Sequence, residues 1–225
     1  MRGNMTGQEV LSDLGEGLPL GEAVYRALRE ALRSGVYKPG DRLREEEVAN
    51  RLKVSRTPVR EAFGRLVSKG LVVPGQGRGL IVRRLDQAEV VELYAMREIL
   101  EAAAARLAAR HASEPEIEAL RDIEKDFEAA SDAAEMARLN RIFHESIFAA
   151  SRNRYLDSAL QELQDAIALL GSTTFTVDGR PSPAAAEHRA LIEAMAARDG
   201  DKADALARAH IHEALRARLK LMQRG

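Results

Sequence analysis

The sequence contains no cysteine in its 225 residues, and only 4% of them are aromatic. Without cysteine the chain cannot form a disulfide framework, a thiolate nucleophile or a zinc–thiolate site, so His, Asn and carboxylates are the ligands left for a metal ion. Apolar runs near the ~20 residues that span a bilayer are missing as well. Residues 1–20 lack the basic and apolar regions of a signal peptide, so we expect a cytoplasmic chain without a membrane partner.

The chain has almost no net charge, with 34 Lys and Arg against 35 Asp and Glu, but these charges are unevenly distributed. Residues 18–86 hold 15 Lys and Arg and eight Asp and Glu, an excess of seven positive charges. Because the whole chain carries −1, the rest has an excess of eight negative charges. A basic segment on an otherwise acidic protein is typical of a module that binds a polyanion, although many basic faces are merely solvated.

Composition and length together indicate two globular domains. Hydrophobic residues make up 45% of the chain and charged residues 31%, which is typical of packed helices. A chain of this length is long for one compact domain and sufficient for two, each with its own core. Residues 1–17 are weakly patterned, and we interpret them as a flexible N-terminal arm.

Three helices and a hairpin are predicted in the basic segment. Apolar spacing predicts helices over 21–34, 45–52 and about 57–69. Ser55 or Thr57 can cap the third helix. The apolar runs Leu71-Val72-Val73 and Leu80-Ile81-Val82 flank a glycine-rich tip, a pattern that predicts two short strands joined as a wing.

The third of these helices has one apolar face and one polar face. The residues of its apolar face, which we expect to be buried, are Val59, Ala62, Phe63, Leu66 and Val67. Arg56, Thr57 and Arg60 lie away from them. Three helices followed by a wing indicate a winged helix-turn-helix, whose third helix enters the major groove, where an arginine fork can bridge guanine O6 and N7. The alternative is a capped surface helix with solvated arginines.

Everything after the wing is predicted to be helical. The expected helices are 87–111, 114–130, 132–151, 154–170, 183–198 and 201–222. The fold class is therefore mainly α: an N-terminal winged helix-turn-helix followed by a C-terminal all-α helical bundle.

Three of the five histidines are predicted to point into this bundle. His188 and His210 fall among apolar residues at helical spacing, and His144 borders such a stripe with Asn140 one turn before it. Three inward imidazoles are costly to bury unless each has a partner, and a shared divalent cation would satisfy all of them. The alternative is three independent core histidines bonded to carbonyl groups or water.

Arg97 is a charged residue on an apolar stripe that includes Leu93 and Leu100. A buried guanidinium needs an anion, either from a ligand or from Glu98, Glu101 or another helix. Tyr94 lies close by in the sequence, and it either lines a cavity or belongs to the core.

Three segments of the basic region resemble the GntR-type regulators in order and spacing: Pro39–Leu43 (PGDRL), Val54–Ala62 (VSRTPVREA) and Gly70–Val72 (GLV). The resemblance covers about residues 20–84, and the helical remainder resembles the effector (FCD) domain of the FadR-like branch. It implies a homodimeric repressor of palindromic operator DNA that is released by a metabolite. The implied domains are 18–83 for DNA binding, 84–87 as a linker and 88–225 for effector binding and dimerisation.

The resemblance also implies site residues. The positions of Ser55, Arg56, Thr57 and Arg60 contact DNA in the family, and the wing, here Gln76, Gly77, Arg78 and Gly79, reaches the minor groove. Glu46 is a departure, because some relatives have a DNA-contacting arginine there. Many FadR-like effector domains hold a metal ion at the positions of Asn140, His144, His188 and His210, although the first is more commonly Asp. Zinc, nickel and manganese all suit such ligands.

The resemblance places an arginine of the 87–111 helix in the effector cavity, so Arg97, with Tyr94, is expected to contact a small carboxylate. Two other functions stay open: a metal-dependent, hydrolase-like activity in the C-terminal domain, and a DNA-binding protein that senses no ligand. No H-E-x-x-H motif is present, and Glu187 next to His188 points about 100° away from it on a helix. We therefore do not expect an enzyme.

Overall fold

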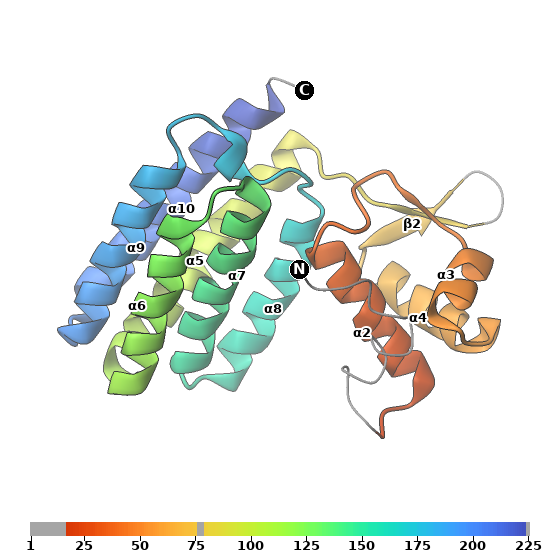
Figure 1. Ribbon diagram of the computed structural model, residues 1–225, viewed down its shortest axis with the longest axis horizontal. Coiled ribbons are helices and arrows are strands. Elements are labelled where there is room, and N and C mark those ends of the chain that lie inside the picture. Colours follow the sequence, from red (N-terminus) through yellow and green to blue (C-terminus); the bar gives the residue numbers. More distant parts are fainter. Residues whose placement is uncertain (1–16, 76–78, 224–225) are drawn as a thin grey trace. The chain divides into compact units, whose positions relative to one another are not determined.

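The structure is a computed structural model that describes residues 17–75 and 79–223 (Figure 1). The described residues form two compact units, the first containing those before Asp86 together with Gln164–Gly171, the second Asp86–Leu163 and the chain from Ser172 onward. The arm predicted for 1–17 lies outside the described residues apart from Gly17, and so do the wing residues Gln76, Gly77 and Arg78.

The first unit has the predicted winged helix-turn-helix fold. It contains α2 (Leu20–Arg33), β1 (Arg42–Leu43), α3 (Glu45–Leu52), α4 (Arg56–Ser68), β2 (Val72–Pro74) and β3 (Leu80–Val82). The strands form an antiparallel sheet in the order β1-β3-β2, with Arg42 opposite Ile81 and Val73 opposite Ile81 on the other side. The strand β1 was not predicted, because two residues are too few to show an alternating pattern.

The turn between α3 and α4 is held by backbone geometry. Lys53 adopts the left-handed conformation at φ 54°, and its N–H donates to carbonyl groups of Ala49 and Asn50. Ser55 is extended, and α4 begins at the next residue. At the wing, Gly79 has φ 130°, and a Cβ atom there would lie 2.8 Å from the Leu43 carbonyl oxygen, so only glycine fits.

The core of the first unit lies between α2, α4 and the sheet. Val24, Val59 and Leu66 are completely buried in it. Val67, which was predicted to join this core, is instead 40% exposed. The prediction failed because the chain turns after α4 and places Leu71 and Val72, both buried, against the core.

The last turn of α8 (Arg154–Ala168) also belongs to the first unit. Asp165 accepts hydrogen bonds from Nε of Arg29 at 2.9 Å and from Nε of Arg33 at 2.6 Å, both on α2. Leu169 is buried in the apolar core of the unit. The first unit therefore includes a short segment that comes 80 residues or more after the wing in the sequence.

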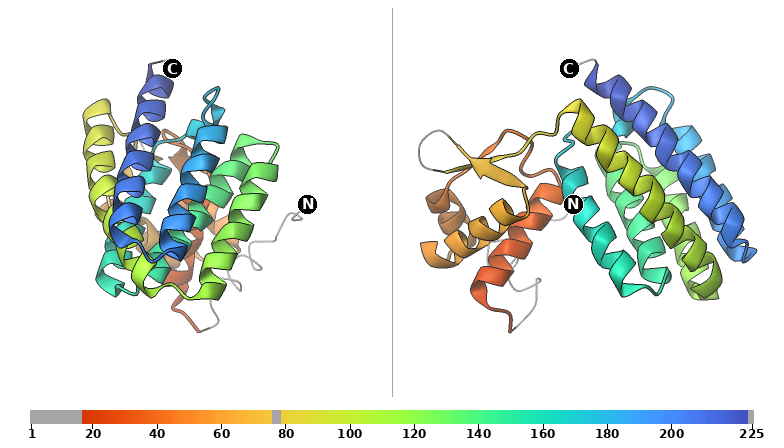
Figure 2. Two further views of the ribbon diagram at one scale, coloured as in Figure 1. Left: turned by 90° about the vertical axis from the view of Figure 1, so that its left-hand side faces the viewer. Right: turned by 180° about the vertical axis from the view of Figure 1, so that it is seen from behind.

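The second unit is the predicted all-α bundle. Its helices are α5 (Gln87–His111), α6 (Glu114–Ala129), α7 (Ala133–Ala150), the first part of α8, α9 (Pro181–Ala196) and α10 (Gly200–Met222), with the short 3₁₀ helix η1 (Thr174–Thr176) before α9. In Figure 2, α5 and α10 lie side by side along their length. Alanines such as Ala105 and Ala108 are completely or almost completely buried, and such small side chains permit close packing of helices. No helix in the described ranges has the length and apolarity needed to cross a membrane.

Side-chain caps fix where several of these helices begin. Asp86 accepts from the backbone N–H of Glu89, and the Glu89 carboxylate accepts from the N–H of Asp86, which forms a capping box at the start of α5. Asp132 caps α7 and Asp199 caps α10, because each side chain accepts a hydrogen bond from a backbone N–H in the first turn of its helix. The predicted helix boundaries agree with the structure to within about two residues.

Substitutions at two adjacent positions of α4 test this packing. Leu66→Ala should lower the free energy of unfolding of the first unit by about 2–5 kcal/mol, because Leu66 is completely buried. Val67→Ala should change it by less than about 0.5 kcal/mol. Urea unfolding followed by circular dichroism measures both, and equal losses in the two variants would contradict the exposure of Val67.

Candidate metal centre and DNA-reading face

Three imidazoles from three helices converge in the second unit. His144 lies on α7, His188 on α9 and His210 on α10, and all three are buried. The ring centroids are 5.8 Å apart for His144–His188, 5.2 Å for His144–His210 and 4.9 Å for His188–His210. One nitrogen from each ring lies within 4.8 Å of the others. The prediction that these three histidines point into the bundle is therefore confirmed.

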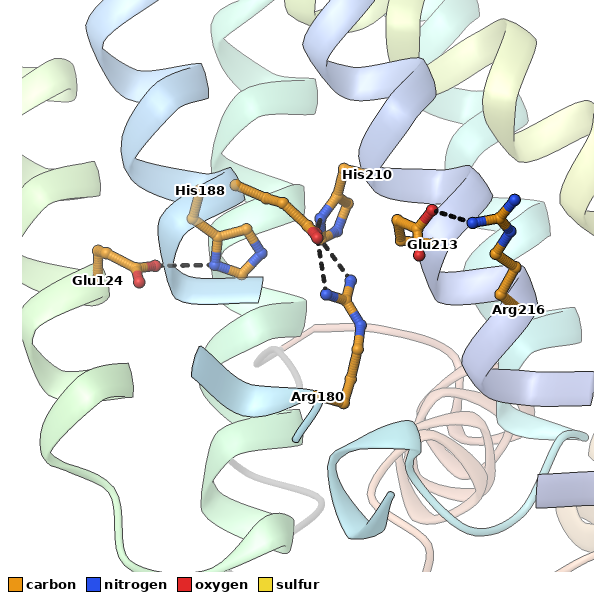
Figure 3. Close-up of polar contacts among 7 residues, drawn as sticks. Glu124, Arg180, His188, His210, Glu213 and Arg216 are labelled. Carbon is orange, nitrogen blue, oxygen red and sulfur yellow. Dashed lines mark hydrogen bonds and ion pairs between the residues drawn. The ribbon is translucent and has the colours of Figure 1, made fainter. Parts of the chain in front are cut away.

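The Nδ1 atom of each imidazole faces a glutamate on another helix. Nδ1 of His188 is 2.8 Å from Oε2 of Glu124 on α6, and Nδ1 of His210 is 2.6 Å from Oε2 of Glu187 on α9 (Figure 3). Nδ1 of His144 lies 2.8 Å from Oε2 of Glu101 on α5. Glu101 and Glu187 have lowered pKa values, and a carboxylate can only accept, so these two pairs favour the tautomer of His144 and His210 with the proton on Nδ1 and the lone pair on Nε2.

Arginines hold two of these three glutamates. Arg97 donates from Nε to Oε1 of Glu101 at 2.7 Å. Arg180, at the start of α9, makes a bidentate pair with Glu187 through two bonds of 2.9 and 2.8 Å (Figure 3). Glu124 differs, because among the described residues no arginine bonds to it, and its Oε1 is buried without a hydrogen-bond partner.

The pKa values of the glutamates follow from these partners. Burial opposes ionisation of Glu101, but the charge of Arg97 and the contact with His144 outweigh it and lower the pKa of Glu101 to about 2. The pKa of Glu187 is also lowered, because bonds from His210 and Arg180 outweigh its burial. Burial raises the pKa of Glu124 to about 8, and the charge of Arg189 offsets only part of that.

The imidazoles of His188 and His210 are held neutral. Burial, followed by the repulsion that a protonated ring would meet from His210 and His144, lowers the pKa of His188 well below its usual range. Burial lowers the pKa of His210 to about 4, although its bond to Glu187 acts in the opposite direction. A neutral imidazole with a free Nε2 lone pair is the form that ligates metal ions.

The donor set fits a divalent cation. Among the described residues, Nε2 of His144 and Nε2 of His188 are buried without a hydrogen-bond partner. Buried polar atoms without partners are rare in native proteins, and a bound ion or water is an explanation for them. Phe143 stacks on His188 with centroids 4.3 Å apart, which keeps this side of the site apolar. Asn140 is half-buried on α7, one turn before His144.

Arg97 and Tyr94 lie next to this cluster on α5. Both are buried, and the Arg97 guanidinium lies 4.7 Å above the Tyr94 ring. Of the partners considered for Arg97 from the sequence, the structure selects Glu101, and through Glu101 it connects Arg97 to His144. A carboxylate contact for Arg97 and Tyr94 stays a prediction.

The predicted DNA-reading residues lie on the solvent-facing side of α4. Ser55, Arg56, Thr57 and Arg60 are exposed, whereas Val59 between them is buried. Nη2 of Arg56 is 3.3 Å from Oε1 of Glu46, and Nε of Arg60 donates to Oε2 of Glu45 at 2.8 Å. Gly79 lies at the described edge of the wing.

Sequence reasoning missed the glutamates as partners of the histidines. Glu124 and Glu187 fall in helices that carry many solvated acidic residues, so nothing in the pattern distinguishes them. Glu187 was considered only as a general base for a metal-bound water, a role not expected because it points away from His188, and the structure pairs it with His210. Glu101 had a signal, because it follows Arg97 by four residues, the spacing at which ion pairs form on a helix.

Family models match most of the described chain. The model for the FCD domain matches residues 92–213, and the model described as bacterial regulatory proteins, gntR family, matches residues 20–82. The first of these matches includes the three clustered histidines and their glutamates, and the second includes α3, α4 and the wing.

Named relatives and a solved structure agree with these matches. The HTH-type transcriptional regulator YdhC of Bacillus subtilis is 31% identical over 84% of this chain and 86% of its own length. The HTH-type transcriptional repressor RspR of Escherichia coli is 27% identical over 87% of each chain. The structure of E. coli McbR/YncC superimposes with a TM-score of 0.83 at 21% identity, covering 91% of this chain and 99% of that one, which shows a shared fold.

The buried pair of Arg97 and Glu101 can be tested by its removal. Arg97→Met should lower the free energy of unfolding of the second unit by about 3–5 kcal/mol, because the Glu101 carboxylate is left buried without its cation. The double variant Arg97→Met/Glu101→Gln should recover part of that loss. Thermal unfolding followed by circular dichroism measures both, and a single variant as stable as wild type would refute the pairing.

Proposed function

The chain belongs to the gntR family of bacterial regulatory proteins and carries an FCD domain, and from this premise we propose that it is an operator-binding repressor controlled by a small organic acid. A regulator of this kind acts on the chromosome, so the proposal places it in the cytoplasm. The named relatives are regulators, which favours a regulator over an enzyme.

The recognition helix is the observation that carries the DNA-binding part of the proposal. The exposed face of α4 presents Arg56, Thr57 and Arg60 to solvent. Its opposite face is anchored in the core by Val59 and Leu66. A helix presented in this way can enter the major groove without any loss of core packing. Guanidinium groups bind guanine bidentately, so these arginines are the side chains proposed to read bases. Ser55 and the wing residues 76–79 complete the proposed contacts.

We propose that the chain binds as a homodimer to a palindromic operator. One short module gives limited affinity, and two modules related by a two-fold axis read two half-sites. The second unit offers a surface for such an association, because Val91, Met96 and Ile99 are exposed apolar residues on α5. Large exposed apolar side chains on one helix are typical of a protein–protein contact.

Repression is the proposed outcome of operator binding. RspR, whose name describes a transcriptional repressor, aligns over most of this chain. A protein that occupies an operator blocks the promoter by its presence, and this requires no additional activating surface.

The histidine cluster supports a metal ion in the second unit. His144, His188 and His210 would hold zinc, nickel or manganese through imidazole nitrogens, with Asn140 as a neutral fourth ligand. When bound, the ion would supply positive charge and a common ligation point for α7, α9 and α10. Glu101 and Glu187 orient two of the imidazoles for that role.

A small carboxylate is the proposed effector. A metal site with a neutral Asn140 in place of a carboxylate ligand keeps more positive charge, and Arg97 with Tyr94 lies next to it. The ligand alters operator affinity only by its differential affinity for two helix arrangements. A coupling of ~1–3 kcal/mol would lower operator affinity about 5- to 150-fold.

The hydrolase alternative is disfavoured by the partners of Glu187. A metal-bound water needs a general base, and Glu187 is occupied by Arg180 and His210. A ligand-independent DNA-binding protein stays a distinct alternative. It differs from the proposal in that no acid would change its operator affinity.

Arg60→Ala should weaken binding to the sequence that wild type selects from a random DNA library, with a loss of ~1–3 kcal/mol in base discrimination. The variant should retain the fold of the wild-type protein, because Arg60 is on the exposed side of α4. Titrations at fixed salt measure the affinity, and footprinting shows whether two half-sites are protected.

Arg26→Ala is the matched control, because it removes an exposed arginine from α2, outside the recognition helix, where Arg26 pairs with Glu22. It should retain the base preference of wild type. Equal effects of the two substitutions, or a single asymmetric half-site in the footprint, would refute the proposed mode of DNA recognition.

His188→Ala should abolish metal binding and, with it, the response of operator affinity to acid. Wild-type protein dialysed against zinc, nickel or manganese should retain about one ion per chain. Metal at about 100 times its dissociation constant should stabilise the fold by about 2.7 kcal/mol. Metal analysis and thermal shift measure these effects.

His212→Ala is the control, because His212 is exposed on α10, two residues from His210. It should retain the metal. Metal contents that are the same in the two variants would contradict the site, and a metal-free protein that still responds fully to acid would separate the effector from the metal.

A further inference from the structure

The first turn of α3 carries three consecutive glutamates, Glu45, Glu46 and Glu47. Acidic residues at a helix N-terminus interact favourably with the helix dipole, and this alone would account for their presence. Two of them do something more, because α3 packs beside α4 (Figure 1) and their carboxylates reach the exposed arginines of α4. Glu47 instead pairs with Arg44, next to its own helix.

The two interhelical pairs use different edges of the guanidinium. Glu45 accepts from Nε of Arg60 at 2.8 Å. Bidentate recognition of guanine can use the two terminal nitrogens of an arginine, and in the described part of the chain no other group pairs with Arg60. Glu45 therefore occupies Nε of Arg60 and leaves the two terminal nitrogens available to a base. The Arg60 side chain is 65% exposed.

Glu46 contacts a terminal nitrogen of Arg56, whereas Glu45 contacts the inner Nε of Arg60. Its Oε1 is 3.3 Å from Nη2, a terminal nitrogen that a base or phosphate would also use. Both side chains are more than half exposed, so this is a weak, screened pair. A base or phosphate that accepts from Nη2 of Arg56 would compete with Glu46 for that nitrogen.

We propose that Glu45 is a specificity-determining residue that positions Arg60 for base reading, whereas Glu46 lowers affinity for all DNA by competing for Arg56. This inference rests on the proposed DNA-binding function and goes beyond it, because it assigns opposite roles to adjacent residues of the same type. Glu45 acts through Arg60 and is a positioning residue rather than a base contact.

Alanine substitutions of the three glutamates make a matched set. Each removes one negative charge and one helix-dipole contact from the same turn, so Glu47→Ala reports the general effect of that loss. The probes are two duplexes: the sequence that wild type enriches from a random library, and a scrambled version of it. Affinities are measured over a range of salt concentrations, because phosphate contacts set the salt slope.

Glu45→Ala should lower affinity for the enriched duplex about fivefold or more, the lower end of what one bidentate arginine–guanine pair supplies. Its affinity for the scrambled duplex should equal that of Glu47→Ala. Glu46→Ala should raise affinity for both duplexes beyond Glu47→Ala and make the salt slope steeper by up to about 1. Glu45→Gln should retain part of the specificity, since an amide oxygen can still accept from Nε of Arg60.

Library selection with Glu45→Ala and Arg60→Ala gives a second readout that a loss of stability would not produce. Both variants should lose the same base of the selected sequence. The inference is overturned if Glu45→Ala selects the wild-type sequence, or if it behaves like Glu47→Ala on both duplexes. A wild-type protein that enriches no sequence would overturn the proposed function, and this inference with it.

Discussion

The burial of three imidazoles beside one another is the constraint on which the second unit depends. Burial takes the two nitrogens of each ring out of water, and a buried polar group without a partner lowers the stability of the fold by about 1–3 kcal/mol. The chain meets this cost on the Nδ1 side with Glu101, Glu124 and Glu187, which come from three helices. Buried carboxylates in turn require cations, and Arg97 and Arg180 are placed where two of those glutamates need them. One requirement thus determines polar residues on α5, α6, α7, α9 and α10.

Arginine–glutamate pairs occur in both units, but their surroundings give them different consequences. The pair of Arg97 and Glu101 is buried, so neither partner can be removed without leaving a charge in a medium that solvates it poorly. The pair of Arg60 and Glu45 is exposed, and there the same chemistry has little effect on stability. An exposed pair can still determine which edge of a guanidinium faces a partner, so the role we propose for this pair is in recognition rather than in folding.

The fold could be predicted from the sequence largely because its signals are local. Periodic apolar residues define each helix within a short window, and the inward direction of His188 and His210 follows from the same periodicity. Contacts between helices leave no such signal: the pairing of Glu124 with His188 joins residues 64 apart in the sequence. Val67 was misplaced for a related reason, because whether the end of a helix reaches the core depends on where the following residues turn.

The Nε2 atoms of His144 and His188, which have no hydrogen-bond partner in the described structure, argue against a purely structural role for the histidine cluster. If the histidines served only to fill a core, apolar side chains of similar volume would do so without leaving Nε2 of His144 and His188 buried and unbonded in the described structure. The outer nitrogens are held in fixed directions, and those of His144 and His210 lie against carboxylates of lowered pKa. Rigid outer contacts and unsatisfied inner atoms are the arrangement expected of preformed ligands. The proposed ion would contact α7, α9 and α10 at once, and it would therefore act on the packing of helices rather than on a single loop.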